Sequence, residues 1–522
     1  MKTLAETIEN EVATLAPHLV IVARAGTGKT TTLVEGLRAI QGESSEFIPS
    51  PQQAVIWQEM AKSDVNSSTC FVAFNKSIAK ELEKRVPNGV EAMTLHSLGY
   101  RALKEVFPNA GMQKWKISNI VESMCGMTSF EIRKRKPGLI PAIQKLVDIA
   151  KMNLAKLDRD SLIALAVHYD IDSGGDSSLV LNMVPDVIEE CKDVSKWGFD
   201  FCDMIWIPVV LELSVKTYDV LLVDEAQDLN RCQQELAIKS GTRLIFCGDD
   251  RQAIYGFCGA DSKSLKTLES QLSETKVGCE VLPLTVTRRC GTAIVKEAQK
   301  LVPDFEAHES NCEGSILHLG FKGEKAYTQY VEEGDMILCR TNAPLISQCF
   351  LFLREGRKAT IQGRDVAEGL ITTVKKLLSD TSRAKDFCQE SNPVVDLENA
   401  LENWVMEESE KEACKKHPDE DKLIRVQDRH DCLMCFCENT RTVGEVINKV
   451  NSLFTDNKES LGIRLSSIHK AKGLEAKRVF IIQPKGASIP HPMAKSAHAR
   501  DQEYNLLYVA QTRAIEELCY VN

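Results

Sequence analysis

The stretch Ala23–Thr30, with the sequence ARAGTGKT, decides the fold because it joins a β-rich run to a helical pattern. The run is His18–Val22, and the helical pattern is Thr31–Ile40, which places its leucine and isoleucine side chains on one side. Glycines in such a turn let backbone N–H groups approach phosphate oxygens, and the N-terminus of the following helix favours an anion. Lys29 adds a positive charge for the β- and γ-phosphates, and Thr30 adds a hydroxyl for Mg²⁺. The pattern predicts a phosphate-binding loop for a nucleoside triphosphate.

This predicted phosphate site departs from the usual loop at one position, since Ala23 stands where the first glycine is common. The motif alone indicates a nucleoside triphosphate and does not say which activity uses it. The residues predicted to form the site are Ala23, Gly26, Thr27, Gly28, Lys29, Thr30 and Thr31.

Two later runs have the form of strands with polar ends. Leu221–Asp228 (LLVDEAQD) is apolar and ends in carboxylates. Ligands of open α/β sheets bind at the carboxyl ends of the strands, so we expect Asp224 to reach Mg²⁺. We expect Glu225 to orient or deprotonate an attacking water. In the run Leu244–Phe257, Gln252 is the residue expected to sense the γ-phosphate.

The composition is that of an ordinary globular protein: 522 residues, a net charge of −10 and 43% hydrophobic residues. No apolar stretch approaches the ~20 residues that span a bilayer, and the start, Met1–Glu6, lacks the basic and apolar regions of a signal peptide. The 18 cysteines are scattered, so we expect reduced thiols and a cytoplasmic location. The acidic balance argues against a broad basic face for nucleic acid.

Short apolar runs alternate with helical patterns, which is typical of parallel sheets with helices on both faces. We expect a helix over Ser77–Arg85 and a surface loop over Gln41–Pro51. Regions 99–214 and 346–460 are richer in helix-like patterns and charge, and we interpret them as inserted subdomains. The expected strands are His18–Val22, Cys70–Phe74, Val220–Val223, Leu244–Cys247, Met336–Cys339 and Val479–Ile482.

Six further segments follow the phosphate loop in a recognisable order. They are Phe74–Glu81 (FNKSIAKE), Thr94–Leu98 (TLHSL), Leu284–Cys290 (LTVTRRC), Cys339–Asn342 (CRTN), Ser467–Glu475 (SIHKAKGLE) and Leu506–Ala514 (LLYVAQTRA). Together with the phosphate loop and the DEAQD segment, they make the chain resemble the UvrD/Rep family of superfamily 1 helicases along nearly its whole length. The last two segments are the most specific.

The resemblance implies an α/β fold of two RecA-like P-loop NTPase domains with parallel sheets, each interrupted by a mostly helical insertion. The first RecA-like domain would comprise residues 1–98 and 215–285, with the helical insertion at 99–214. The second would comprise residues 286–345 and 461–522, with a reduced insertion at 346–460. ATP would lie between the two domains.

The activity implied by the resemblance is that of an ATP-dependent DNA helicase or translocase, moving 3′→5′ on single-stranded DNA with ATP and Mg²⁺ as cofactors. The catalytic residues implied are Glu225, Gln252, Arg289 and Arg513. The two arginines would stabilise the transition state only when the cleft is closed, which couples hydrolysis to a hinge motion.

The remaining nucleotide contacts also come from the resemblance. Thr30 and Asp224 would hold Mg²⁺, and Glu475 would contact the nucleotide. Arg288 stands where the family has a tyrosine that stacks on adenine, and a guanidinium can also stack on an aromatic base.

The DNA side of the motor is implied by a further set of motif residues. Stacking of bases on aromatic rings suits sequence-independent tracking, because every base has a π-face. For His96 a buried histidine with one hydrogen bond is the alternative. The set is Phe74, Asn75, His96, Ser97, Tyr255, Phe257, Arg340, Asn342 and His469.

A groove of this kind needs no broad basic face, so the charge of −10 does not exclude DNA. Without a strong global field, loading should depend on a free strand or a partner. We expect as partners single-stranded DNA and single/double-strand junctions, with replication or recombination proteins as further candidates and no membrane. The expected location is the cytoplasm or the nucleoid.

Several positions differ from the family. Its glutamine motif precedes the phosphate loop, whereas the first glutamine here is Gln41, after the loop. Either adenine is read differently or Gln52 or Gln53 folds back. Cys258 stands where the family has an arginine. Six residues of the second insertion suit either a zinc site or a buried apolar segment: Cys414, His417, His430, Cys432, Cys435 and Cys437.

Alternatives to a helicase stay open. One is a translocase that remodels protein–DNA or strand-exchange complexes with little duplex unwinding, in line with the short second insertion. Another is a nucleotide-gated nucleic-acid-binding protein without significant hydrolysis, against which the two carboxylates, Gln252 and the two arginines argue. A fused nuclease is not expected, because Asn522 closely follows the last motor motif.

Overall fold

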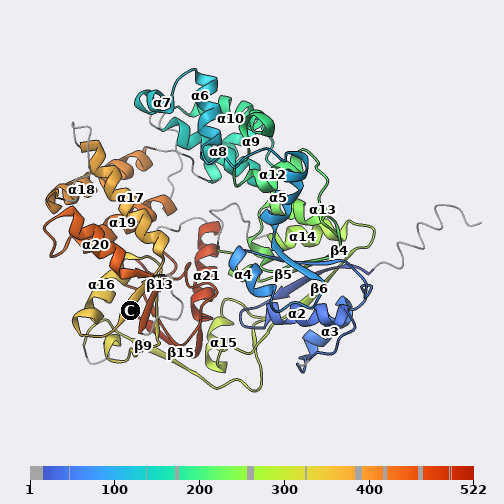
Figure 1. The fold of residues 1–522 in the computed structure, drawn as a ribbon. Helices are drawn as coiled ribbons and strands as arrows, with labels where there is room; N and C mark the ends of the chain where they lie inside the picture. The colour runs from blue at the N-terminus through green and yellow to red at the C-terminus, as the bar shows by residue number, and fades with distance from the viewer. Residues whose placement is uncertain are drawn as a thin grey trace, which may run out of the picture. The chain divides into compact units, whose positions relative to one another are not determined.

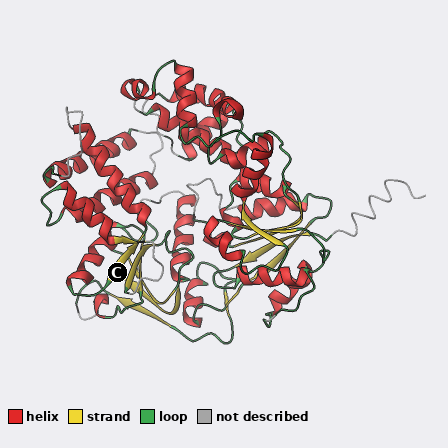
Figure 2. Cartoon of the chain, viewed as in Figure 1, coloured by secondary structure: helices red, strands yellow, loops and turns green. Residues whose placement is uncertain are grey.

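The computed structural model divides into two compact units, Met1–Thr285 and Val286–Asn522, and each is considered by itself. Within each unit the helices cover the faces of a parallel sheet (Figures 1 and 2), which confirms the predicted α/β class. The described residues are 16–45, 47–136, 138–169, 171, 176–254, 264–323, 326–381, 391–414, 420–455, 462–492, 494 and 497–522.

The first unit is built on a six-stranded parallel sheet with the strand order β3-β2-β4-β5-β1-β6. Its strands are apolar on both faces, as a parallel sheet covered by helices requires; Ile21 and Leu222 face one side, and Leu221 and Leu244 the other. The strands are β1 (His18–Ala23), β2 (Thr69–Ala73), β3 (Val90–Thr94), β4 (Tyr218–Val223), β5 (Gly241–Gly248) and β6 (Cys279–Leu284).

Helices pack on both faces of this sheet. On one face lie α2 (Lys29–Ile40) and α3 (Pro51–Met60), which bury Leu33 and Ile56. On the other face lie α13 (Arg231–Lys239) and α14 (Ser264–Ser273). This arrangement leaves the carboxyl ends of the strands at one edge, where the loops after β1, β4 and β5 meet.

A block of helices connects β3 to β4 in the first unit. Its interior holds an ion cluster in which Lys116 and Lys151 donate to Asp203 at 2.6 and 2.7 Å. All three side chains have no exposed area, and removing one partner of such a buried pair costs about 3–5 kcal/mol. The helices are α5 (Leu95–Val106), α6 (Lys116–Cys125), α7 (Ser129–Arg135), α8 (Leu139–Asn153), α9 (Arg159–His168), α10 (Ser177–Cys191), α11 (Val194–Trp197) and α12 (Asp203–Val210).

The second unit is built on a seven-stranded parallel sheet with the strand order β12-β11-β13-β10-β14-β15-β9. Its strands are β9 (Ser315–Leu319), β10 (Met336–Cys339), β11 (Ala359–Gln362), β12 (Phe454–Thr455), β13 (Ile463–Ser467), β14 (Ala476–Ile482) and β15 (Ala514–Val521). Its helices are α15 (Thr292–Ala298), α16 (Ala343–Arg354), α17 (Arg364–Thr381), α18 (Val394–Ala413), α19 (Glu420–Cys437), α20 (Val443–Leu453) and α21 (Ala497–Gln511).

All six expected strands are present; Met336–Cys339 has the expected bounds, and the other five differ at one or both ends by up to three residues. The helix expected over Ser77–Arg85 is α4 (Lys76–Leu82), so its predicted end was wrong. The expected loop stops at Ser50, because Pro51 begins α3 behind a capping box that Ser50 forms with Gln53. In the described part of the chain no helix has the length and apolarity to cross a bilayer.

The cysteines of the second insertion form no metal cluster among the described residues, while His417 lies outside them. Cys432 and Cys437 are buried on α19, and Cys414 is exposed at the end of α18. Cys435 lies 3.3 Å from the Ser347 hydroxyl. The described cysteines are free thiols, and the part of α19 that carries them packs as an apolar helix face.

Candidate nucleotide site and nucleic-acid interface

The phosphate loop runs from β1 into α2 at the carboxyl edge of the first sheet. Gly26 and Gly28 have φ angles of 68° and 79°, in the left-handed region that glycine enters without strain. The Thr27 hydroxyl donates to the Arg24 carbonyl at 2.9 Å and closes the loop on itself. The glycines therefore stand where the backbone needs them, immediately before the helix N-terminus.

The loop meets the acidic end of β4 through two side-chain contacts. Lys29 Nζ lies 3.2 Å from Glu225 Oε1. The Thr30 hydroxyl donates to Asp224 Oδ2 at 2.7 Å. Two motifs that are almost two hundred residues apart in sequence thus form one polar site at the sheet edge.

Glu225 adopts a strained backbone conformation, with a φ of 54° that is uncommon for a residue other than glycine. Its N–H donates to Asp224 Oδ1 at 2.9 Å, so the chain turns directly after the strand. This turn holds two neighbouring carboxylates at the same strand end. Strain of this kind is typical of functional sites.

The charges of this site are strongly coupled. Burial raises the pKa of Asp224, the Glu225 charge adds to the rise, and Lys29 and the Thr30 hydrogen bond oppose it. Burial disfavours the charge on Lys29, yet the carboxylates of Glu225, Asp249 and Asp224 raise its pKa above the ordinary value. The site therefore has more carboxylate than its cations neutralise, which suits a divalent cation with oxygen ligands.

The end of β5 adds a second set of carboxylates. Arg24 Nη1 lies 3.2 Å from Asp249 Oδ1 and 2.5 Å from Asp250 Oδ1. Gln252 is buried and donates to Asp249 Oδ2 at 2.8 Å. Gln227 bridges the two strand ends, because it donates to Glu225 and accepts from the Asp249 N–H at 2.9 Å.

Arg24 and Gln227 were not singled out in the sequence, although both belong to this network. Arg24 lies inside the phosphate loop, and Asp249 and Asp250 follow a strand, so the charge complement was a usable signal. Gln227 had no comparable signal, because its role depends on β4 and β5 being neighbours in the sheet.

The two glutamines after the loop fold back beside it. Gln53 donates to the Thr32 hydroxyl at 2.9 Å, and its amide nitrogen lies 3.8 Å from the position that a Cβ on Gly28 would occupy. Gln52 exchanges two hydrogen bonds of 2.9 Å with Thr285, the residue after β6. Of the two alternatives left open for these glutamines, the structure favours the fold-back.

The ends of β2 and β3 carry the first residues expected on the DNA side. Phe74 follows β2 and is 44% exposed. Asn75 caps α4 by accepting from the Ile78 N–H at 2.9 Å. Ser97 lies in the first turn of α5, where its hydroxyl is 3.0 Å from that of Thr94. Since β2 is adjacent to β4 and β3 is adjacent to β2, these residues continue the same sheet edge away from the phosphate loop.

His96 stacks on an aromatic ring that the sequence interpretation missed. The rings of His96 and Phe201 are 4.0 Å apart between centroids and 21° from parallel, and Phe201 is 63% exposed. Burial lowers the pKa of His96 to about 4, so the imidazole is neutral near pH 7. Phe201 lies more than a hundred residues from His96 and within the helical block, so only the fold brings them together.

In the second unit, three residues expected on the DNA side lie at the ends of β10 and β13, within internal contacts. Arg340 donates to Glu503 at 2.7 Å. The Asn342 side chain donates to Asp428 at 3.0 Å, and the Asp428 carboxylate also accepts two backbone N–H groups at the start of α16. Burial, with the nearby charge of Arg340, lowers the pKa of His469 to about 3.

The two arginines predicted to be catalytic in the second unit differ in solvent exposure. Arg289 is partly exposed and lies 2.7 Å from Glu475, another predicted nucleotide contact. Arg513 is 2% exposed and donates to the carbonyls of Val509 and Leu474 at 2.9 and 3.1 Å. Arg288 is exposed. Tyr255 and Phe257 lie outside the described residues.

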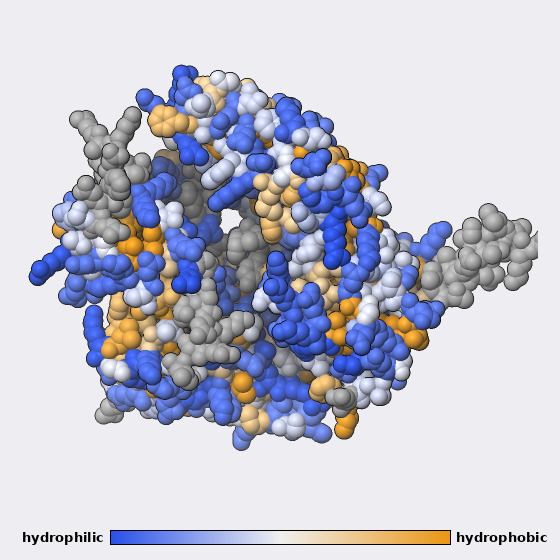
Figure 3. Space-filling model, viewed as in Figure 1, coloured by the Kyte–Doolittle hydropathy of each residue, from blue (hydrophilic) through white to orange (hydrophobic). Residues whose placement is uncertain are grey.

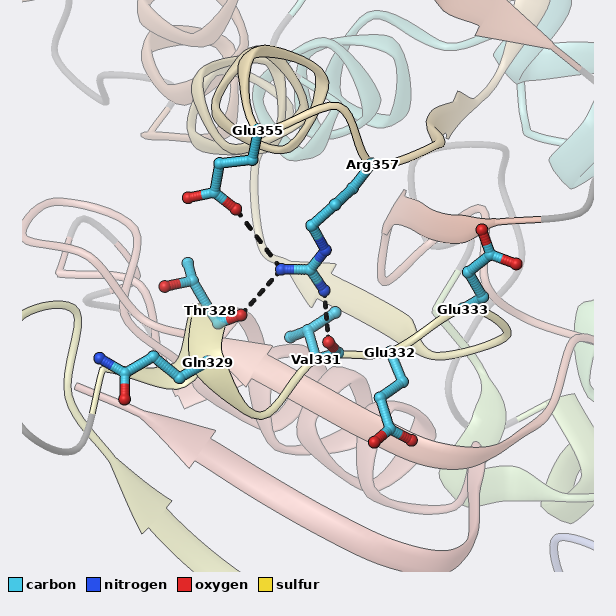
Figure 4. A pocket seen from close by; sticks show the side chains of 7 residues that line it. All are labelled: Thr328, Gln329, Val331, Glu332, Glu333, Glu355 and Arg357. Atoms are coloured by element: carbon cyan, nitrogen blue, oxygen red, sulfur yellow. Dashed lines mark hydrogen bonds and ion pairs between the residues drawn. The ribbon is translucent and has the colours of Figure 1, made fainter.

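A surface cavity of ≈ 490 Å³ in the second unit lies away from these motifs (Figure 4). It is lined by the segment before β10 and by Glu355 and Arg357, just before β11, and so lies at the amino ends of the strands. Arg357 donates to the carbonyls of Thr328, at 2.8 Å, and Val331. Its guanidinium is therefore engaged by the loop that forms the wall.

The parallel sheets and the phosphate loop before α2 define a P-loop NTPase with RecA-like domains. Two family models match the chain: the UvrD/REP helicase N-terminal domain over residues 4–273 and the UvrD-like helicase C-terminal domain over residues 178–521. The chain belongs to the UvrD-like helicase family, as the order of its motifs predicted.

Named relatives support the same family. The chain is 24% identical over 571 residues to F-box DNA helicase protein 1 of Schizosaccharomyces pombe, covering 96% of this chain and 55% of that protein. It is 24% identical over 527 residues to F-box DNA helicase 1 of Gallus gallus, covering 95% and 46%. It is 23% identical to the ATP-dependent DNA helicase PcrA of Bacillus subtilis, covering 52% and 36%. The chain thus spans about half the length of the first two relatives.

Among solved structures, an arterivirus nonstructural protein 10 (helicase) in complex with DNA aligns over 99% of this chain and 63% of its own, with a TM-score of 0.31 and 9% identity.

Proposed function

We propose that this chain is an ATP-dependent DNA helicase or translocase that moves 3′→5′ along single-stranded DNA and hydrolyses ATP at the strand ends of the first unit. The observation that carries the proposal is the pairing of the phosphate loop with the acidic end of β4: Lys29 contacts Glu225, and Thr30 contacts Asp224. Lys29, Thr30, Asp224 and Glu225 are thus held together at one strand end.

In the proposed mechanism, Lys29 leaves Glu225 to bind the terminal phosphates, which frees that carboxylate. Thr30 and Asp224 present a hydroxyl and a carboxylate oxygen, the ligand types that Mg²⁺ prefers. A bound Mg²⁺ would neutralise charge on the β- and γ-phosphates. The freed Glu225 then orients and deprotonates the attacking water, while Gln227 fixes the position of its carboxylate.

The β5 end serves as the sensor of the γ-phosphate in this proposal. Gln252 donates to Asp249, which also holds Arg24 of the phosphate loop. In this proposal Gln252 senses the terminal phosphate, and its hydrogen bond to Asp249 carries the resulting movement to the end of β5. Four residues of the second RecA-like domain are proposed to act on the same nucleotide: Arg288, Arg289, Glu475 and Arg513.

The DNA path is proposed over the ends of β2 and β3, with Phe74 and the Phe201–His96 stack as aromatic contacts. The full set of proposed members of this path or its support is Phe74, Asn75, Ser97, Tyr255, Phe257, Arg340, Asn342 and His469, together with the stack above.

We also propose the domain boundaries 98/99, 214/215, 345/346 and 460/461. Binding at single/double-strand junctions, replication or recombination proteins as partners, and a location with the DNA are proposed as well.

Two assays test this function. ATP turnover is measured with single-stranded DNA, duplex DNA and RNA, and unwinding is measured on duplexes with a 3′ or a 5′ single-stranded tail. We expect stimulation mainly by single-stranded DNA and unwinding only of the 3′-tailed substrate. Strong stimulation without unwinding would favour a translocase that remodels complexes. No turnover with any nucleic acid would contradict the proposal and favour a nucleotide-gated binding protein.

A further inference from the structure

One segment of the helical block exposes a large aromatic side chain. Trp115, at the start of α6, is 60% exposed, and Met112, three residues earlier, is 58% exposed. Trp57 and Trp206 are buried, and the other two tryptophans of the chain are partly buried. Apolar patches on an otherwise hydrophilic surface, as Figure 3 shows on one face, commonly mark interaction sites.

The segment that carries Trp115 (residues 111–115) is joined by backbone hydrogen bonds to the segment that carries Phe201 (residues 198–201). Phe199 N–H donates to the Gly111 carbonyl at 3.1 Å, and Gln113 N–H donates to the Phe199 carbonyl at 2.8 Å. Gly198 has a φ of 68°, and a Cβ there would lie 2.5 Å from the Gly111 carbonyl oxygen. The two segments can approach so closely only because glycine occupies this position.

A buried ion pair fixes the two segments a second time. Lys116 follows Trp115 directly, and Asp203 lies two residues after Phe201. Their side chains meet at 2.6 Å with no exposed area, and Lys116 also donates to the Cys191 carbonyl at 2.7 Å. The two exposed aromatic rings therefore stand on a rigid support, which lowers the entropy lost when a ligand binds.

The charge beside Trp115 indicates the kind of ligand. Lys114 Nζ lies 5.4 Å from the centroid of the Trp115 ring. A cation next to an exposed aromatic ring combines base stacking with attraction to a phosphate, the pattern of proteins that track single strands. We take the ligand to be a nucleic-acid strand because the Lys114 charge complements its phosphates.

We propose that Trp115 and Lys114 form a second stacking station for single-stranded DNA on the helical block, on a backbone segment hydrogen-bonded to the one that precedes Phe201. This inference rests on the proposed function, because it extends the proposed DNA path by one further station. One base stacks on the indole face opposite Lys114, and Lys114 contacts the adjoining phosphate.

The test titrates the full-length protein with oligo(dT) while two signals are followed: tryptophan fluorescence and the anisotropy of a labelled strand. We expect quenching in the wild-type protein that disappears in Trp115→Phe. We expect Trp115→Ala to weaken binding by about 5- to 100-fold, and Trp115→Phe to recover most of that loss, because a phenyl ring still stacks. Phe130→Ala is the matched control, since Phe130 is 73% exposed on α7 of the same block and outside this station.

Lys114 is tested by salt dependence. Lys114→Gln should reduce the slope of log K against log salt by about 0.7, the value for one phosphate contact to a single strand. An unchanged slope would remove Lys114 from the station.

The outcomes separate the inference from the function it rests on. If the wild-type protein binds no oligo(dT), the proposed function fails. If it binds, but Trp115→Ala behaves as Phe130→Ala and the quenching persists in Trp115→Phe, only the second station is overturned. If Trp115→Ala changes the sedimentation of the protein alone and leaves oligo(dT) binding intact, the surface is a protein–protein contact and the proposal is wrong.

Discussion

The strand ends of the two units differ in what their motif residues contact. In the first unit the residues of the phosphate loop and the β4 end pair with one another, as Lys29 does with Glu225. In the second unit Arg340 and Asn342 are tied to Glu503 and Asp428, which lie outside the motifs. In the proposed mechanism Lys29 replaces its contact with Glu225 by one with the nucleotide. The contacts of Arg340 and Asn342 stabilise the fold around the strand ends of the second unit. Substitutions at Lys29 and Glu225 should therefore damage activity, whereas loss of the acceptors of Arg340 and Asn342 should damage stability.

The largest expected effect is on catalysis in the first unit. Lys29→Ala removes the cation proposed to bind the terminal phosphates and should lower DNA-stimulated ATP turnover by about 10²–10³-fold. Lys192→Ala, which removes a surface lysine that pairs with Glu189, is the control and should turn over normally. Near-normal turnover in Lys29→Ala would refute the site.

The next effect is on the stability of the second unit. Asp428→Ala leaves two N–H groups at the start of α16 and the Asn342 amide without their acceptor, and should lower the free energy of unfolding by about 1–2 kcal/mol. Chemical denaturation measures this loss. Full stability in Asp428→Ala together with lost turnover would reverse the division between the units.

A smaller effect of opposite sign is expected at Asp224. Its pKa is raised in the folded chain, so it contributes stability below its unfolded pKa and loses that contribution as the pH rises. The ionised carboxylate is therefore unfavourable at neutral pH, and Asp224→Asn should raise the free energy of unfolding while abolishing turnover. A destabilised Asp224→Asn protein would show that the residue is structural.

The smallest effect concerns pH. Burial holds the pKa of His96 at about 4, below its ordinary value of 6.5. The neutral ring contributes stability at pH values above its ordinary pKa of 6.5, and this contribution is lost as the pH falls through its pKa of about 4 in the folded chain. Binding of single-stranded DNA should therefore show no titration of His96 between about pH 5.5 and 8. A transition near 6.5 that vanishes in His96→Phe would make His96 a charged phosphate contact instead.

How far the sequence predicts this molecule depends on where each signal lies. The phosphate loop, Asp224 and Glu225 could be predicted because each signature is contiguous and stands at a strand end. Gln227 and Phe201 could not, because their contacts form only when distant segments become neighbours. Arg340 and Asn342 show the converse: their motifs are plain in the sequence, but the acceptors Glu503 and Asp428 become visible only in the fold.

In the proposed mechanism, Glu225 activates water once Lys29 has moved to the nucleotide. The most direct measurement compares ATP binding with ATP hydrolysis in Glu225→Gln at saturating single-stranded DNA. We expect the variant to bind Mg²⁺-ATP at least as tightly as the wild-type protein, because Lys29 loses its competing charged partner, while turnover falls by about 10²-fold or more. Wild-type turnover in this variant, or loss of ATP binding together with turnover, would contradict this role of Glu225.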